Sequence, residues 1–280
     1  MLSEPDPVAR AVAERWEVGE ATGDHVDGVP VRRLRDGVLV LRRPVRHVHD
    51  ERLDLRLPGA LAALRPTLAF PSIHRSVSGT RCLTVHPLGN PGGSAELGGQ
   101  PRTLVPTDPR AMAAVFRALR ERATGLGIPA TYEATHHGPA IALPAFFVEI
   151  AHAQEDPPLG EEVAVLSDAL RGSPVDPSDQ VALAVGGGHY APHFSDLAWS
   201  RKWAFGHILS RHALEDLRAE TAREALARSP GAEGIVFARA QDRTHPALAG
   251  LGPALRDLDA PRREPGPVGP TSAARPASGT

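Results

Sequence analysis

The chain has 280 residues, a formal net charge of −2 and a single cysteine, Cys82. No apolar run approaches the ~20 residues that a membrane-spanning helix needs, and the polar N-terminus is unlike a signal peptide, so a soluble, cytoplasmic protein is expected. One cysteine excludes a disulfide framework and a cysteine-rich zinc site, and the near-neutral charge means that a nucleic-acid partner would need a local basic face.

The first half of the chain predicts helices and short buried strands. Residues 7–18 have helical spacing, with Asp6 as N-cap and Pro7 at the first position. Strands are expected at 37–41, 67–70 and 82–86, and a helix capped by Asp108 at 109–123. Residues 87–108 contain too many glycines and prolines for regular structure, and so long a loop between strong elements favours a functional role.

The second half alternates strand and helix. Strands are expected at 130–135, 145–150, 181–185 and 233–238, with FGHIL as a short strand or loop. Helices are expected at 159–171, after Ser195, at 213–228 and at 245–258. This alternation predicts an α/β fold, a mixed or parallel sheet flanked by helices. Residues 1–65 are expected to be a divergent N-terminal part of the same domain, 66–260 the catalytic core and 261–280 a disordered tail.

Histidines gather at the ends of the predicted strands. Nine of the thirteen lie between His74 and His212. Ligands of open α/β sheets bind beyond the carboxyl ends of strands, so these histidines are expected to share one edge of the sheet. Those that follow a strand directly are His86, His136, His137 and His189.

The stretch EATHHGP places two adjacent histidines after a strand. Neighbouring strand residues point to opposite faces, so His136 and His137 can share a site only if the strand has ended, and the following Gly-Pro pair supplies such a turn. Glu133 or Thr135 could orient an imidazole by a hydrogen bond. The alternative is a surface turn with two solvated histidines.

The stretch VALAVGGGHYAPH, residues 181–193, breaks from a buried strand into three glycines. Glycines there let the backbone approach a ligand and present amide groups to an oxyanion or phosphate. The pattern is not the dinucleotide fingerprint, and Pro192 is expected to interrupt the helix start. The alternative is a tight turn with His189 packed against its own sheet.

Other polar groups carry weaker signals. His74, Arg75 and Ser76 suit contact with an anion or an RNA backbone. No G-x-S-x-G elbow supports a serine hydrolase. Glu96, in the glycine-rich loop, is interpreted as a turn residue, with a metal ligand or a base as the alternatives. No close-spaced motif such as H-E-x-x-H is present, so a metal would be held by histidines from distant strand ends.

These segments resemble the archaeal and plant type of D-aminoacyl-tRNA deacylase. The similar stretches, in family order, are HRSVSGTRCLTVHPLGN, AELGG, YEATHHGP, FVEI, GGGHYAP and FGHI. The resemblance implies a phosphorylase- and peptidyl-tRNA-hydrolase-like architecture, hydrolysis of the ester between a D-amino acid and the tRNA 3′ end, and Zn²⁺ as cofactor. D-aminoacyl-tRNA is then the expected partner.

The residues and the resemblance together predict a site. The expected catalytic residues are Glu133, Thr135, His136, His137 and His189. The expected contacts to substrate or tRNA are His74, Arg75, Ser76, Asn90, Gly186, Gly187, Gly188 and Tyr190. The candidate zinc ligands are His86, His136, His137 and His189. Which histidine is base and which is ligand stays open.

The chain also departs from the family. The first 65 or so residues match its start poorly, and its Asp-x-Lys motif near the last strand is replaced by VFARAQD, so arginines are expected to contact tRNA instead. Two rival functions remain: another metal hydrolase or nucleoside phosphorylase on the same fold, and a non-catalytic tRNA-binding protein. Phosphate-dependent nucleoside cleavage would indicate a phosphorylase, and tRNA binding without turnover a binding protein.

Overall fold

The computed structural model describes residues 1–16, 19–75, 79, 81–152, 158, 160–200, 203–251 and 256–257, so Ser76 and the predicted tail lie outside the described residues. The helices are α1 (Pro7–Arg15), α2 (Gly59–Ala63), α3 (Pro109–Ala123), α4 (Gly160–Gly172), α5 (Pro192–Trp199), α6 (Arg211–Leu214) and α7 (Ala219–Ala227). Short 3₁₀ helices are η1 (His47–His49), η2 (Leu53–Arg56), η3 (Thr124–Leu126), η4 (Ala240–Thr244) and η5 (Pro246–Leu251). None of the described helices has the length and apolar character to cross a membrane.

The strands form two four-stranded sheets and three small ones. The first large sheet has the order β10 (Ala130–Tyr132), β7 (Cys82–Pro87), β11 (Ala145–His152), β6 (Leu68–Arg75). The second has the order β13 (Trp203–Leu209), β12 (Gln180–Val185), β14 (Ala232–Phe237), β15 (Arg256–Asp257). The small sheets pair β1 (Leu2–Ser3) with β5 (Arg42–Arg43), β8 (Gly89–Asn90) with β9 (Thr103–Leu104), and β2 (Glu20–Val26) with β3 (Val29–Arg33) and β4 (Leu39–Val40).

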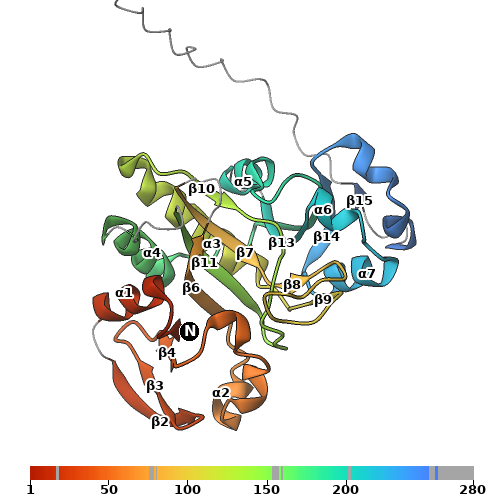
Figure 1. The fold of residues 1–280 in the computed structure, drawn as a ribbon. Coiled ribbons are helices and arrows are strands. Elements are labelled where there is room, and N and C mark those ends of the chain that lie inside the picture. Colours follow the sequence, from red (N-terminus) through yellow and green to blue (C-terminus); the bar gives the residue numbers. More distant parts are fainter. Residues whose placement is uncertain are drawn as a thin grey trace, which may run out of the picture.

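The first large sheet is mixed, which corrects the expectation of one shared edge. β7 runs antiparallel to β11, whereas β10 is parallel to β7 and β6 is parallel to β11. The carboxyl ends of its strands therefore lie at two opposite edges (Figure 1). The predicted α/β architecture is confirmed, but side chains from β6 and β7 can meet only across a face of the sheet.

The two faces of this sheet differ because side chains alternate along each strand. One face carries Val85, Val148 and Ile150, which pack in a core cluster with α1, α3 and α4. The opposite face begins with Phe70 and Phe147 in a second apolar cluster. Further along, that face turns polar, and there it carries His74, Thr84, His86 and Glu149.

The second large sheet is entirely parallel and joins the first through residues 133–135. The amides of Glu133, Ala134 and Thr135 donate to the carbonyls of Val85, His189 and Ile208, respectively. The predicted strand 130–135 therefore ends as β10 at Tyr132, because its last residues bond to the other sheet. This bridge brings the loop after β12 beside the polar face of the first sheet.

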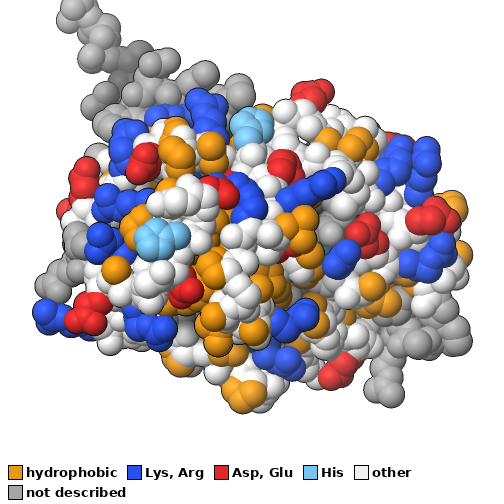
Figure 2. Space-filling model, turned by 90° about the horizontal axis from the view of Figure 1, so that it is seen from below, with side chains coloured by type: hydrophobic (Ala, Val, Ile, Leu, Met, Phe, Trp, Pro, Cys, Tyr) orange, Lys and Arg blue, Asp and Glu red, His pale blue; other side chains and the backbone are white. Residues whose placement is uncertain are grey.

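The N-terminal part packs on the core at its start and forms small sheets of its own. Val8 and Val12 of α1 lie in the core cluster, and a largely apolar cavity of about 390 Å³ lies where β3 and β4 face β6 and α3. The face in Figure 2 shows hydrophobic side chains near its centre, with basic and acidic groups interspersed around them. This face is therefore not the single-sign basic surface that would suit an RNA backbone.

Most predicted helices are confirmed, and their caps explain why. Asp6 and Asp108 accept hydrogen bonds from the first turns of α1 and α3, and both helices begin with proline. Pro192 was expected to interrupt a helix, but it occupies the first turn of α5, where a missing N–H costs nothing.

Three other boundaries were wrong. The predicted strand 37–41 is only β4, and the predicted helix 213–228 is broken into α6 and α7. The predicted helix 245–258 is absent from its described part, where η5 is followed by β15. The sequence analysis also missed β2 and β3, because their residues, mostly exposed in β2 and mostly half-buried in β3, lack the apolar pattern of buried strands.

Candidate metal centre

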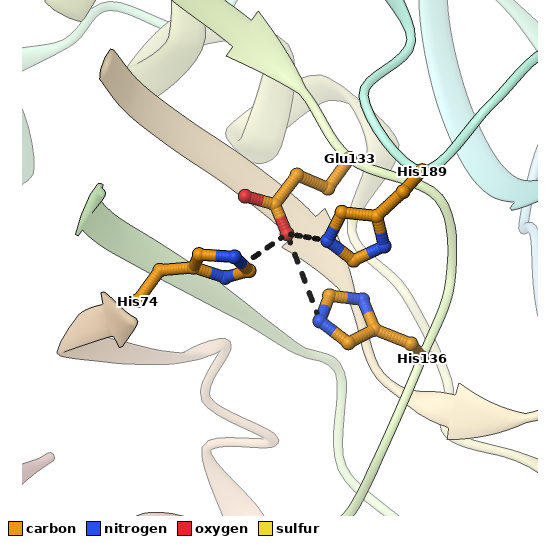
Figure 3. A group of neighbouring side chains, drawn as sticks. All are labelled: His74, Glu133, His136 and His189. Atoms are coloured by element: carbon orange, nitrogen blue, oxygen red, sulfur yellow. Dashed lines mark ion pairs between the residues drawn. The ribbon is translucent and has the colours of Figure 1, made fainter. Parts of the chain in front are cut away.

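Four polar side chains converge over the polar face of the first sheet (Figure 3). His74 ends β6, Glu133 and His136 follow β10, and His189 follows β12. The Oε2 atom of Glu133 lies 3.1 Å from Nε2 of His189, 3.6 Å from Nδ1 of His74 and 3.6 Å from Nε2 of His136. One carboxylate oxygen thus faces three imidazoles, and the four residues offer ligand atoms within 4.8 Å of one another.

A second group adjoins the first on its buried side. His86 lies with its ring centroid 4.1 Å from that of His136 and 4.9 Å from that of His137. Its ring stacks on that of Phe147 with centroids 5.2 Å apart, and its Nε2 is 3.5 Å from Oε2 of Glu149. Further candidate ligand sets are His86 with His136 and His137, and His86 with Glu133 and Glu149.

The polar atoms of this cluster are buried without being satisfied by the protein. Both oxygens of Glu133 and Nε2 of His86 have no hydrogen-bond partner, although imidazole nitrogens lie 3.1 to 3.6 Å from Oε2 of Glu133. A buried carboxylate left in this state costs free energy unless a cation or donor completes it. Convergent imidazole and carboxylate atoms match the ligands that Zn²⁺ takes when thiolates are absent. The residues present therefore fit a zinc ion.

Backbone carbonyls orient two of the imidazoles. Nδ1 of His136 donates to the carbonyl of Ala134 and Nδ1 of His137 to that of Gly138, both at 2.8 Å. These bonds leave each Nε2 with its lone pair available to a ligand. Burial, together with neighbouring histidines, holds the pKa of His136 well below its usual value, and burial lowers the pKa of His137 to about 4. Both are therefore neutral at pH 7, as metal ligands must be.

The two histidines face one site because the backbone turns sharply. His137 has a φ of +43°, in the left-handed region that few residues other than glycine adopt. The ring centroids of His136 and His137 consequently lie only 4.4 Å apart, although the residues are adjacent in the chain. The alternative of a solvated surface turn is excluded, because both residues are half-buried and their rings pack against His86.

The pKa of His74 is raised, whereas those of His136 and His137 are lowered. Although burial lowers its pKa, the hydrogen bond to Glu149 at 3.3 Å and the charge of Glu133 raise it to about 9. The pKa of Glu149 lies well below its ordinary value, because contacts with His74 and His86 outweigh the cost of burial. At pH 7 the metal-free cluster therefore holds an imidazolium at His74, beside the buried side chains of Glu133 and Glu149.

Some predicted site residues are directed elsewhere. The hydroxyl of Thr135 contacts Nδ1 of His207 at 3.1 Å and accepts from the amide of Ile208, so it supports β13 and does not face the cluster. The side-chain amide of Asn90 donates to the carbonyls of Gly98 and Gln100, which fixes the glycine-rich loop.

The glycine turn after β12 is only partly available to an anion. The amide of Gly186 already donates to the carbonyl of Leu209, which leaves Gly187 and Gly188 as the glycines expected to contact an anion. Tyr190 lies beside His74 and His189, with ring centroids 6.1 and 5.4 Å away, and Arg75 is exposed at the end of β6.

The sequence reading missed two buried polar residues. Glu149 lies in the apolar strand β11, and His207 lies in β13, where Nε2 donates to the carbonyl of Val105. A charged residue within an otherwise apolar, fully buried strand is rare unless it is paired, and this was the available signal for Glu149.

Fold and site together define a mixed α/β protein with a buried histidine–carboxylate centre. Residues 65–248 match the D-aminoacyl-tRNA deacylase family, so the chain belongs to it, which confirms the resemblance. The enzyme named D-aminoacyl-tRNA deacylase of Thermoplasma acidophilum is 36% identical over 168 residues, 60% of this chain and 65% of that protein. The one of Methanosphaerula palustris is 39% identical over 221 residues, 77% of this chain and 47% of that protein.

The chain thus spans less than two thirds of the length of these curated relatives. The crystal structure of a conserved protein of unknown function has a similar fold, with a TM-score of 0.68 and 28% identity over 84% of each chain. The histidine–carboxylate cluster lies entirely within the segment that matches the family.

Proposed function

We propose that this protein hydrolyses the ester of D-aminoacyl-tRNA and releases the free D-amino acid and tRNA. The convergence of His74, Glu133, His136 and His189 within the family segment is the observation that carries this proposal. Water adds to the ester carbonyl, the bond to the ribose oxygen breaks, and that oxygen leaves with a proton. An aminoacyl ester is reactive, so positioned acid/base groups suffice to accelerate this reaction.

Zn²⁺ is the cofactor that we propose for the cluster. Glu133 and His136 belong to the set that opens toward solvent, together with His74 and His189, whereas His86, His137 and Glu149 form its buried side. When bound, zinc supplies a Lewis acid that polarises a carbonyl and lowers the pKa of bound water.

The exposure of the side chains in the cluster indicates which of them can exchange protons with the substrate. The side chain of His189 is 44% exposed, compared with 25% for His136 and none for Glu133. His189 is therefore placed to exchange protons with a substrate that enters from solvent, and the carboxyl group of Glu133, 3.1 Å from its Nε2, stabilises the imidazolium that forms when His189 takes a proton. The amides of Gly187 and Gly188, beside His189, suit the developing oxyanion or a phosphate.

A deacylation assay with matched D- and L-tyrosyl-tRNA, with and without chelator, tests reaction, chirality and metal together. We expect faster hydrolysis of the D-ester, loss of activity with chelator and recovery when Zn²⁺ is restored. His136→Ala and His189→Ala should each lower the rate at least about 100-fold, in the range of a removed acid/base group. His25→Ala is the matched control, because His25 is exposed in β2, outside the cluster.

Three results would count against this proposal. Folded His136→Ala and His189→Ala variants that deacylate at the parent rate would exclude the cluster as the catalytic site. Tight tRNA binding without turnover, with zinc supplied, would indicate a binding protein. Phosphate-dependent nucleoside cleavage would indicate a phosphorylase on the same fold.

A further inference from the structure

One carboxylate outside the cluster joins the two loops that border it. Glu51 lies between η1 and η2, in the N-terminal part that precedes the family segment. Its Oε1 accepts from the amide of Gly99 at 2.6 Å, and its Oε2 accepts from the amide of Ala140 at 2.7 Å. Gly99 belongs to the glycine-rich loop, and Ala140 lies three residues after His137 in the loop of the adjacent histidines.

The loops are too closely packed for the contact to be incidental. A Cβ on Gly98 would lie 1.8 Å from the carbonyl oxygen of Val48, and one on Gly138 would lie 2.2 Å from the amide nitrogen of Gly99. The amide of Gly138 donates to the carbonyl of Leu97, which joins the loops directly. The N-terminal segment, the glycine-rich loop and the histidine loop are therefore stacked with backbone against backbone.

Glu51 is itself held by a buried ion network. Asp50 and Arg43 are 3% and 4% exposed, and they pair at 2.8 Å. Arg56 pairs with Asp50 at 2.5 Å and donates to the carbonyl of Glu51 at 3.0 Å. The amide of Arg52 adds a bond to the carbonyl of Ala140 at 2.9 Å. The segment is thus rigid enough to position what it binds.

The histidine loop needs such support because His137 is in the left-handed region, at a φ of +43°. A residue with a side chain holds that conformation only where its surroundings impose it. The N-terminal segment binds the same loop at Ala140, whose N–H donates to Glu51 and whose C=O accepts from the amide of Arg52.

We infer that Glu51 is a positioning residue, which holds His136 and His137 in the geometry of the metal centre through the amides of Gly99 and Ala140. The inference rests on the proposed function. It also gives the N-terminal part a role, since that part completes the support of the site from outside the family segment.

The test compares Glu51→Gln and Glu51→Ala with the parent and with Glu20→Gln, an exposed acid of β2 in the same N-terminal part. Glutamine retains one acceptor oxygen and alanine retains none, so the effects should be graded. We expect kcat to fall about 10-fold in Glu51→Gln and about 100-fold in Glu51→Ala, as small misplacements of catalytic groups cause, with KM nearly unchanged. Glu20→Gln should behave as the parent.

Two further measurements separate positioning from general destabilisation. Hydrogen exchange should become faster in peptides covering residues 97–100 and 136–141 of the Glu51 variants and stay unchanged elsewhere. The absorption spectrum of the Co²⁺-substituted protein should change in the same variants, because two of its ligands would have moved.

Each outcome decides the inference. Unchanged kcat, exchange and Co²⁺ spectrum in Glu51→Ala would overturn it. A lower thermal stability with parent kcat below the unfolding transition would also overturn it, because Glu51 would then be only structural. If the parent fails to deacylate D-aminoacyl-tRNA but the spectrum and exchange change as described, the proposed function fails and the positioning role stands.

Discussion

Neutralising Glu133 should separate the stability of this protein from its activity. Both carboxylate oxygens are buried and lack hydrogen-bond partners, and His74, the cationic neighbour, is closer to Glu149 (3.3 Å) than to Glu133 (3.6 Å). The imidazolium of His74 is therefore shared between the acidic side chains of Glu133 and Glu149. Because the remaining charge is poorly compensated, replacing it with an isosteric amide removes a desolvation cost without creating a cavity.

We expect Glu133→Gln to raise the free energy of unfolding of the metal-free protein by about 1–3 kcal/mol, because the amide carries no charge to desolvate and its NH₂ group can donate to Nε2 of His136. That corresponds to roughly 2–4 °C in Tm for each kcal/mol in a chain of this size. The same change should lower deacylation at least about 100-fold, because His189, the proposed acid/base group, loses the neighbouring negative charge.

Urea denaturation with chelator present measures the first effect, and the D-tyrosyl-tRNA assay measures the second. Glu133→Gln that is less stable than the parent in chelator, or that deacylates at the parent rate with zinc present, would refute this reasoning. With zinc added, the order of stability should reverse, because the parent gains more from the bound ion.

Three further predictions concern the scaffold around the cluster. Thr135→Val leaves Nδ1 of His207 without its buried hydrogen-bond partner, so the free energy of unfolding should fall by about 2 kcal/mol. The kcat, measured below the unfolding transition, should stay near that of the parent. A large loss of kcat would indicate that Thr135 is a catalytic residue after all. Burial lowers the pKa of His47 and His207 to about 3. The unfolded chain, with ordinary pKa values near 6.5, therefore binds these protons first, and stability should fall below pH 6.5 with a slope that approaches about 1.4 kcal/mol per pH unit for each residue near pH 5. Urea titrations of His47→Gln should show a slope smaller by that amount, and an unchanged slope would contradict the assignment. Gly186→Ala should lower both Tm and kcat, because the new Cβ would lie 2.2 Å from Oδ2 of Asp242 and 3.1 Å from Cβ of Ala238, beside the loop that carries His189. Gly28→Ala, with open space around it, should cost only the left-handed strain of about 1–2 kcal/mol. Equal losses of Tm would exclude the clash.

The sequence by itself determined the elements whose signals are local. A capping aspartate followed by proline and an apolar stripe predicted α1 and α3, and short apolar runs predicted the buried strands. The turn after Thr135 was also readable, because two adjacent histidines can share a site only where a strand has ended. The order of the motifs indicated the family, which the comparison of residues 65–248 confirmed.

Only the tertiary structure decided how the histidines meet. Strand direction is not encoded in any one strand, so the antiparallel pairing of β7 with β11 could not be foreseen, and it moved the cluster from a sheet edge to a sheet face. On that face Glu149 contacts His74 and His86, whereas its position in the sequence indicates only an apolar strand. It also redirected the hydroxyl of Thr135 toward His207, across 72 residues of chain.

The N-terminal part also makes contacts that its sequence does not predict. Its strands lack an apolar pattern, and Glu51 is one acidic residue among many in the sequence. Its contacts with Gly99 and Ala140 span 48 and 89 residues, respectively. Such pairings depend on how the whole chain packs. Local sequence signals therefore predicted the helices, the strands and the candidate site residues, and only long-range packing decided which residues lie together at the site.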